Sequence, residues 1–259
     1  MSERPAALVT GGAIRVGLHF ARTLAGKGYD VAIHYNSSSA NAEAAATEIR
    51  ALGVRCEIFP WDFLSGGDPS GLIDDVVAVF PRLSVLVNCA SIYNAAPVAE
   101  TTMTMLQNEF MVNFFTPFLL SGAFARRVET GNIVNILDNK IAFQQFQYGA
   151  YLSAKKALGE LTKMTAMEFA PRIRVNGIAP GVIMPGVTRS DDYIRWRVQG
   201  IPLQRQGAVE ELGKALLYIL DNEYITGQHL FVDGGEGLFH IGQNAEAYQP
   251  QQGASGDLC

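Results

Sequence analysis

The chain has 259 residues, 48% of them hydrophobic and 17% charged, and this balance excludes an intrinsically disordered protein. A net charge of −5 argues against nucleic acid or an anionic membrane as a partner. The three cysteines and four histidines are scattered, so we expect neither a disulfide framework nor a metal site. No signal-peptide pattern or membrane span is visible, and we expect a cytoplasmic protein.

Short apolar runs alternate with helical patterns along the whole chain. Strands are predicted at 6–10, 29–35, 55–60, 83–90, 132–137, 173–180 and 228–235. Helices are predicted at 16–28, 41–53, 69–80, 102–128 with an irregularity at Pro117, 208–220, and over the segment that carries Tyr151 and ends at Ala170. This alternation predicts one α/β domain of the doubly wound Rossmann type over 1–242, with a parallel sheet between helices, and a polar tail over 243–259.

Glycines cluster where the first strand meets the first helix. Gly11 and Gly12 permit a tight turn there, and Gly17 lets the helix approach the sheet closely. Amide groups exposed at the start of that helix can hold a pyrophosphate. The position directly after the first strand of an alternating chain therefore indicates a dinucleotide site.

The second strand is expected to end near the adenosine ribose. It is followed by Asn36, Ser37 and Ser38, with no acid before Glu43 to bind a 2′-hydroxyl. These neutral donors, with Arg15 adding positive charge, favour a 2′-phosphate and hence NADPH over NADH. The same polar residues can also cap the next helix.

Asp62, just after the third strand, has two open readings. It can accept a hydrogen bond from the adenine amino group, or it can serve as a turn or capping residue.

Tyr151 and Lys155 are four residues apart on a predicted helix and therefore share one face. An ammonium beside a phenol is expected to lower the pKa of the phenol, which lets the tyrosine exchange a proton. Asp138 stands thirteen residues before the tyrosine, at the end of a predicted buried strand. Its carboxylate therefore stands close in the sequence to the proton-exchanging pair and is a candidate member of the same catalytic site.

The chain resembles a short-chain dehydrogenase/reductase over about residues 5–240 through "TGG....G", "LVNCAS", Asn113, "YLSAK", "RVNGIAPG" and "VDGG". The resemblance implies a seven-stranded parallel sheet, NAD(P)H binding, hydride transfer and a homotetramer. It also implies that Tyr151 is the acid, that Lys155 holds the cofactor ribose and tunes the tyrosine, and that Asn113 supports a relay water. The implied cofactor-binding residues are Gly11, Arg15, Val16, Gly17, Tyr35, Asn36, Ser37, Asp62, Asn88, Ala90, Lys155, Pro180, Gly181 and Ile183.

The chain departs from the common family pattern in an informative way. Asp138 replaces the usual serine, and Arg15 replaces the middle glycine of the nucleotide turn. "NCAS" stands for the frequent "NNAG", and Pro185 for a threonine. The first two departures resemble pteridine reductases, the branch that reduces dihydropterins and dihydrofolate. The substrate-binding residues implied by that branch are Ser91, Tyr93, Asp138, Tyr151 and Arg15, with the pterin stacked between Tyr93 and the nicotinamide.

Asp138 also makes chemical sense in this setting. A carboxylate near a ketone would repel the charge that develops on the carbonyl oxygen, whereas a pterin presents N–H donors and needs a proton on a ring nitrogen. The alternative interpretations are that Asp138 pairs with Lys140 at the surface and that Tyr93 is an ordinary aromatic at the pocket mouth. Whether Tyr193 and Trp196, in a lid expected from Pro185 to Gln206, cover the ring or pack the lid stays open.

The leading hypothesis is therefore NADPH-dependent reduction of a C=N bond in a pterin or folate-like small molecule. A reductase of a ketone or another imine is the alternative. A nucleotide-sensing binder without turnover is a third hypothesis, against which the intact Tyr151, Lys155 and Asn113 argue.

Overall fold

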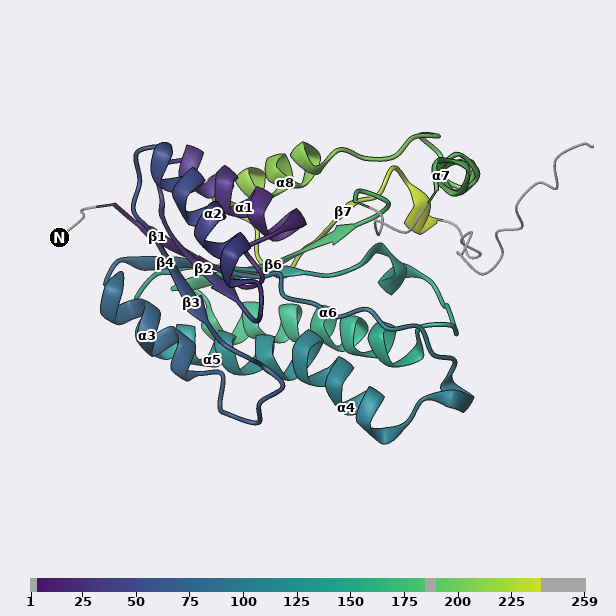
Figure 1. The fold of residues 1–259 in the computed structure, drawn as a ribbon, viewed down its shortest axis with the longest axis horizontal. Coiled ribbons are helices and arrows are strands. Elements are labelled where there is room, and N and C mark those ends of the chain that lie inside the picture. Colours follow the sequence, from purple (N-terminus) through teal and green to yellow (C-terminus); the bar gives the residue numbers. More distant parts are fainter. Residues whose placement is uncertain (1–3, 185–189, 239–259) are drawn as a thin grey trace, which may run out of the picture.

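The structure is a computed structural model that describes residues 4–184 and 190–238. Its seven strands form one parallel sheet in the order β3-β2-β1-β4-β5-β6-β7 (Figure 1). The strands are β1 (Ala6–Val9), β2 (Asp30–Tyr35), β3 (Cys56–Pro60), β4 (Leu83–Asn88), β5 (Gly131–Ile136), β6 (Ile173–Pro180) and β7 (His229–Val232). The predicted doubly wound fold is confirmed.

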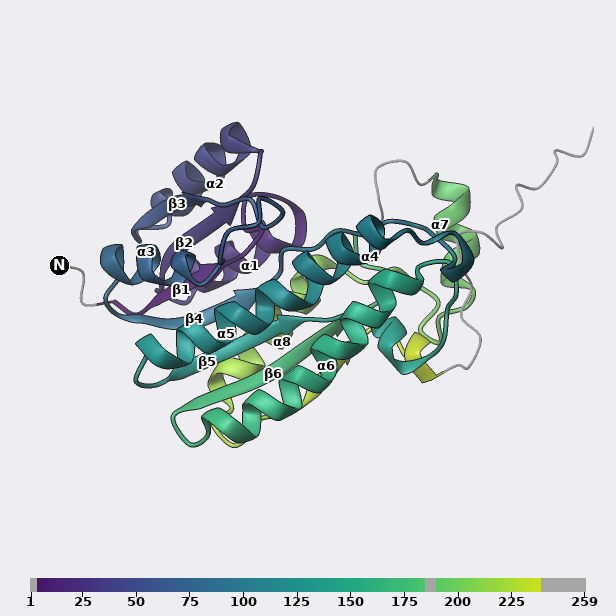
Figure 2. The same cartoon turned by 90° about the horizontal axis from the view of Figure 1, so that it is seen from below.

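Helices cover both faces of the sheet (Figures 1 and 2). One face carries α1 (Arg15–Gly26), α2 (Ser39–Ala51) and α8 (Val209–Asp221), and the other carries α3 (Gly71–Val79), α5 (Thr116–Arg127) and α6 (Gly149–Phe169). The remaining helices are α4 (Met103–Phe110), packed beside α6, and α7 (Asp191–Val198). In 4–184 and 190–238 no helix combines the length and apolar character that a bilayer crossing needs.

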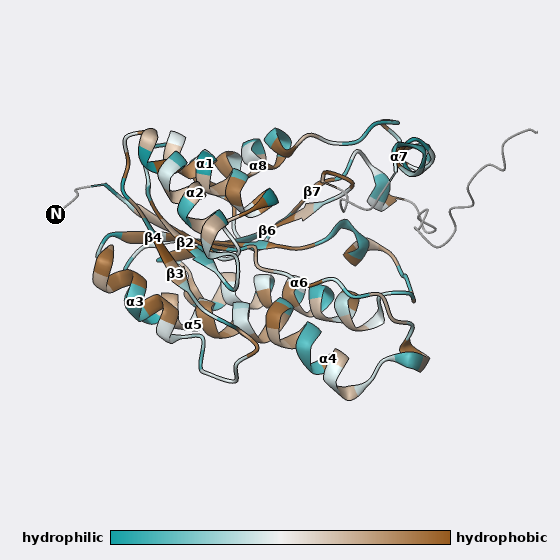
Figure 3. Ribbon diagram, in the orientation of Figure 1, coloured by the Kyte–Doolittle hydropathy of each residue, from teal (hydrophilic) through white to brown (hydrophobic). Residues whose placement is uncertain are grey.

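Two apolar clusters hold the three layers together. Phe20 and Leu24 of α1 and Leu212 of α8 pack in the first cluster, and Leu72 of α3 and Phe124 of α5 in the second. Between them β1, β2 and β4 are buried almost throughout and are mostly apolar (Figure 3). Continuous apolar runs, rather than alternating ones, therefore predicted these strands correctly.

The helix expected over 102–128 is interrupted. A π-helical turn, Met111–Phe115, separates α4 from α5. Pro117, at the start of α5, has no N–H to donate to the carbonyl of Asn113 four residues earlier, which breaks the α-helical pattern there. The predicted irregularity is confirmed, but it lies before the proline and contains Asn113.

The expected lid holds a helix that the sequence analysis did not specify. α7 begins after Ser190, whose hydroxyl accepts a hydrogen bond from the backbone N–H of Tyr193. Pro185 and the tail over 243–259 lie outside the described residues, so the predictions about them are not addressed by the structure.

The first helix touches the glycine turn directly. A Cβ at Gly17 would lie 2.1 Å from the carbonyl oxygen of Gly11, so only glycine permits this approach. The turn opens between β1 and β4, where the order of the strands reverses, and that is where a ligand crevice forms in such sheets. The sequence therefore places Gly17 correctly.

Gly17→Ala should lower the free energy of unfolding by about 1–3 kcal/mol, because the added methyl group overlaps backbone that cannot move freely. Gly26→Ala in the same helix is the matched control: nothing lies within 4 Å of its Cβ position, and no loss of stability is expected. Urea denaturation measures both. Equal effects of the two substitutions would contradict the close approach.

Candidate active site

Tyr151, Lys155 and Asp138 meet at the carboxyl end of β5. The Tyr151 hydroxyl donates a hydrogen bond to Asp138 Oδ2 over 2.8 Å. Lys155 Nζ donates to the carbonyl of Ile136 over 2.9 Å and lies 5.8 Å from the centre of the tyrosine ring. Tyr151 and Lys155 are buried, and the half-buried Asp138 completes the group that the sequence predicts as the catalytic face.

Lys140 approaches Asp138 through its backbone, not as the surface ion pair considered above. Its N–H donates to Asp138 Oδ1 over 2.9 Å and starts the 3₁₀ turn η3 (Asn139–Ala142). Its ammonium donates to the Tyr93 hydroxyl over 2.8 Å. Asp138 thus has one oxygen on backbone and one on the phenol.

The pKa values differ from the expectation drawn from spacing alone. Burial, and then the charge of Asp138, raise the pKa of Tyr151 well above its ordinary value. Burial also lowers the pKa of Lys155 to about 8. Because the carboxylate accepts the phenol hydrogen, ionising Tyr151 would place two anions in contact, and this outweighs the ammonium. Tyr151 is held as a proton donor.

Tyr93 lies at the mouth of the site, with 45% of its surface exposed. Its ring stacks on Tyr148 at 4.1 Å and meets Tyr151 edge-on at 4.6 Å. Lys140 Nζ lies 5.2 Å from the centres of both stacked rings. Tyr93 is therefore part of an aromatic wall that contacts Tyr151, and not an isolated ring.

A cavity of about 230 Å³ follows the ends of β1, β2 and β4. Its lining includes Gly11, Tyr35, Asn36, Ser37, Ser38, Asp62, Ala90 and Ser91. Gly11 has φ +64°, and a Cβ there would lie 3.0 Å from the Cα of Ala90. Glycine thus keeps the passage between β1 and β4 open, and the cradle fits a nucleotide.

Asp62 takes the turn role, and its contact with an adenine amino group stays a prediction. Its Oδ1 accepts from the backbone N–H of Leu64 over 2.9 Å, so it is a turn residue that also borders the cavity.

Arg15 has φ +52°, which explains why a glycine is frequent at this position in the family pattern. Its guanidinium donates to the carbonyl of Met184, in the loop after β6, and it is not among the residues that line the cavity. A preference for NADPH therefore rests on Asn36, Ser37 and Ser38 more than on Arg15.

The other implied cofactor residues fall into two groups. Asn88 is buried at the end of the central strand β4, where its amide donates to Asn135 Oδ1 over 2.8 Å. Val16 packs against the core of the α1 face. Pro180 is the last residue of β6, and Gly181 and Ile183 follow it. A Cβ at Gly181 would lie 2.7 Å from the Cα of Asp233. Cofactor contacts by these residues stay predictions.

Comparisons with known proteins agree with this geometry. A family model described as enoyl-(acyl carrier protein) reductase matches residues 12–236. The solved structure of FolM alternative dihydrofolate reductase 1 from Brucella suis in complex with NADP is 32% identical, with a TM-score of 0.87, covering 96% of this chain and 100% of that one. The chain belongs to the short-chain dehydrogenase/reductase family.

Two curated members of the family are also similar. Pteridine reductase 1 of Leishmania tarentolae is 31% identical, over 90% of this chain and 96% of its own. The 3-oxoacyl-[acyl-carrier-protein] reductase FabG of Staphylococcus epidermidis is 32% identical, over 88% and 97%. The chain is an oxidoreductase of this family, and its relatives act on more than one substrate class.

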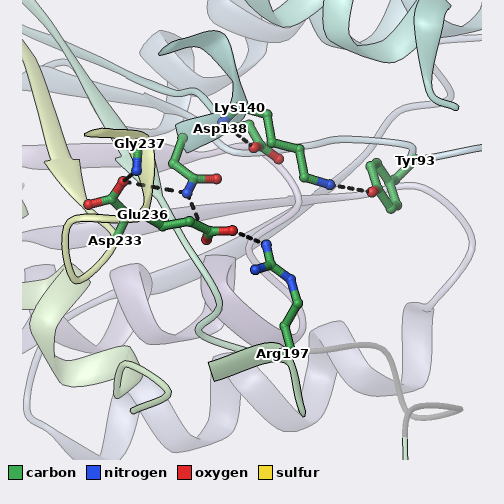
Figure 4. A network of polar contacts seen from close by, with 8 residues as sticks. Tyr93, Asp138, Lys140, Arg197, Asp233, Glu236 and Gly237 are labelled. Atoms are coloured by element: carbon green, nitrogen blue, oxygen red, sulfur yellow. Dashed lines mark hydrogen bonds and ion pairs between the residues drawn. The ribbon is translucent and has the colours of Figure 1, made fainter. Parts of the chain in front are cut away.

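In this short-chain dehydrogenase/reductase a buried network joins α7 to η3, the turn that follows Asp138 (Figure 4). Arg197 of α7 forms an ion pair with Glu236, in the turn after β7. The second oxygen of Glu236 accepts from the Asn139 amide over 2.9 Å, and Asn139 directly follows Asp138. The network thus anchors both α7 and η3. In the part of the chain that the structure describes, no group of three His, Cys, Asp or Glu side chains could hold a metal ion.

Sequence reasoning missed His34, which supports the nucleotide turn. Its Nδ1 accepts from the backbone N–H of Gly11 over 3.0 Å, and its Nε2 lies 2.9 Å from the carbonyl of Trp61. An amide donor on one side and a carbonyl on the other require the neutral ring with its hydrogen on Nε2. A histidine at the end of a strand that precedes the ribose site was the available signal.

His34 should make stability depend on pH. Burial lowers its pKa from 6.5 to about 4, so the unfolded chain takes up a proton in this window while the folded chain does not. The free energy of unfolding should therefore fall by roughly 3 kcal/mol from this group as pH drops from 6.5 to 4. Urea denaturation across that range measures it.

His34→Gln, which cannot titrate, is the control for this prediction. Its pH slope should be shallower than that of the wild type by the same amount, while the contributions of His19 and His229, whose pKa values are also lowered by burial, remain. Identical slopes in the two proteins would show that folding does not lower the pKa of His34.

Proposed function

We propose that this enzyme uses NADPH to reduce a C=N bond in a pteridine, either a dihydropterin or a dihydrofolate-type substrate. The observation that carries the proposal is the 2.8 Å hydrogen bond from Tyr151 to Asp138, a carboxylate at the position where the family pattern has serine. A carboxylate accepts hydrogen bonds only, which suits a ring edge made of N–H groups. The similarity to pteridine reductase 1 and to FolM supports the same substrate class.

The hydrogen bond also suggests how the proton is delivered. Without a substrate, the Tyr151 hydroxyl donates its hydrogen to Asp138. Substrate N–H groups can replace the phenol at the carboxylate, which frees that hydrogen for a ring nitrogen. The raised pKa of Tyr151, caused first by burial, keeps the proton on the phenol until a substrate arrives. A bound nicotinamide supplies the hydride.

NADPH is proposed on separate grounds. The cavity that would hold the adenosine ribose is bordered by Asn36, Ser37 and Ser38 and thus by neutral donors. The FolM structures from Brucella suis and Brucella canis contain NADP. A 2′-phosphate can accept from these donors, whereas an acid would repel it. A homotetramer in the cytoplasm, implied by the family, stays a prediction.

Reduction of a carbonyl compound or of another imine is the second candidate. Tyr151 and Lys155 are sufficient to protonate a developing alkoxide, and FabG, named as a 3-oxoacyl reductase, is as similar in sequence as the pteridine reductase. Asp138 argues against it, because the carboxylate lies within hydrogen-bond distance of the phenol that would face the carbonyl oxygen.

Oxidation of NADPH in the presence of dihydrobiopterin, dihydrofolate and a panel of small ketones tests the substrate class. Asp138→Asn should lower kcat on the pterin by about 10²-fold or more, and Tyr151→Phe by ~10²–10⁴, because each disturbs the proton donor. Asp138→Ser should shift relative activity toward ketones. Asp74→Asn, the same change at a surface ion pair with Arg127, should have no effect.

Two results would count against the pteridine proposal. One is a wild-type enzyme that oxidises NADPH with ketones and with none of the pterins or folates. The other is an Asp138→Asn variant with the kcat of the wild type.

The cofactor preference has its own test. Asn36→Asp introduces an acid at the end of β2 and should shift the ratio of kcat/KM for NADPH over NADH by tenfold or more toward NADH, equivalent to about 1.4 kcal/mol. Asn41→Asp adds the same charge on the exposed side of α2, outside the cavity, and should change the ratio little. A wild type that uses both cofactors equally would refute the assignment.

A further inference from the structure

Glu109 is a buried carboxylate that the proposed reaction does not use. It lies in α4, one helical turn before Asn113, and is 1% exposed. Its Oε1 accepts from the backbone N–H and from the amide of Asn94, each over 2.9 Å. Its Oε2 accepts from the Asn113 amide over 2.8 Å. A carboxylate so placed answers three donors, which is more than a neutral side chain of its shape can accept.

The contact fixes which way the Asn113 amide faces. One Asn113 Nδ2 hydrogen goes to Glu109 and the other to the carbonyl of Ile92 over 3.0 Å. Both partners accept only, so the nitrogen of Asn113 must face them. The Asn113 oxygen is left to face Ser91, at 2.6 Å from its hydroxyl.

The direction of the next hydrogen bond follows. Asn113 Oδ1 cannot donate, so the Ser91 hydroxyl donates its single hydrogen to it. The other neighbour of the hydroxyl, the carbonyl of Ile92 at 3.3 Å, is also an acceptor. Ser91 borders the nucleotide cavity and therefore presents only lone pairs to a ligand.

We propose that Glu109 is a positioning residue that, through Asn113, makes Ser91 an obligate hydrogen-bond acceptor and so selects substrates that present N–H groups to the site. The proposal rests on the proposed function and deepens it. Ser91, after β4, and Asp138, after β5, then form two acceptors on neighbouring strands. A ketone has no hydrogen to donate to either, whereas an aminopteridine has several.

The hydrogen-bond direction can be tested in the protein without a substrate. Neutron diffraction from deuterium-exchanged crystals should show the Ser91 deuteron directed at Asn113 Oδ1 and no deuteron on Glu109. A deuteron directed from Ser91 into the cavity would overturn the proposal, whatever the substrate is.

Ligand discrimination tests the consequence. With NADPH bound, the ratio of dissociation constants for 2,4-dioxopteridine over 2,4-diaminopteridine measures the preference for donors. Ser91→Ala should lower this ratio about tenfold by weakening the diamino compound alone, and Glu109→Gln should lower it similarly. Asn94→Ala, which removes a partner of Glu109 but leaves its contact with Asn113, should leave the ratio unchanged.

A double-mutant cycle separates positioning from a general structural role. In a Ser91→Ala background, Glu109→Gln should change the ratio less than twofold, because the hydroxyl through which it acts is gone. Additive effects, or equal weakening of both ligands by Ser91→Ala, would overturn the proposal. If Glu109→Gln does not fold, the single Ser91→Ala variant and the neutron structure still decide.

The outcomes also distinguish this inference from the proposed function. Failure of both pteridines to bind, with the Ser91 deuteron on Asn113, would refute the pteridine assignment and leave the role of Glu109 standing. Pterin turnover by an enzyme whose Ser91 deuteron is directed into the cavity would refute the role of Glu109 alone.

Discussion

The hydrogen bond between Tyr151 and Asp138 is the contact around which the rest of the site is arranged. It places a carboxylate beside a buried phenol, where an uncompensated charge is costly. The backbone N–H of Lys140 and the ammonium of Lys155 compensate this charge. Burial lowers the pKa of Lys155 to about 8, and the charge of Asp138 opposes that shift. Asp138 thus accepts hydrogen bonds from both the backbone and a side chain.

That arrangement depends on segments distant in the sequence. Lys155 donates to the carbonyl of Ile136 in β5. Asn139 of η3 donates to Glu236, and Glu236 forms an ion pair with Arg197 of α7. Removing one partner of such a buried ion pair strongly destabilises a protein, because the other charge is left unpaired. α7 and the segment that carries Asp138 are therefore parts of one packed unit.

Polarity, more than shape, unifies the site. Tyr151 is kept protonated by its neighbours, while Asp138 and Ser91 offer lone pairs. A substrate that must gain a proton at one ring position and donate N–H groups at another matches this pattern. The aromatic pair of Tyr93 and Tyr148 adds a flat surface beside it, on which stacking contributes roughly 0.5–1.5 kcal/mol.

Much of this was predictable because its signals are local. Short continuous apolar runs that alternate with helical patterns along the chain predict a parallel sheet. Gly11 and Gly17 mark close backbone approaches that no other residue permits. The four-residue spacing of Tyr151 and Lys155 places both on one helix face. Asp138 could be assigned to the same site because it follows a buried strand and because the family resemblance implies that it faces the helix.

The tertiary structure decided what depends on neighbours from other segments. Spacing alone suggested a lowered pKa for Tyr151, but burial and Asp138 reverse the sign. Arg15 donates to the carbonyl of Met184 and does not line the cavity, and His34 supports Gly11 from the next strand. The charge of each group and the direction of its hydrogen bonds depend on contacts with residues distant in the sequence. The amino-acid sequence contains these residues but does not give the distances between them.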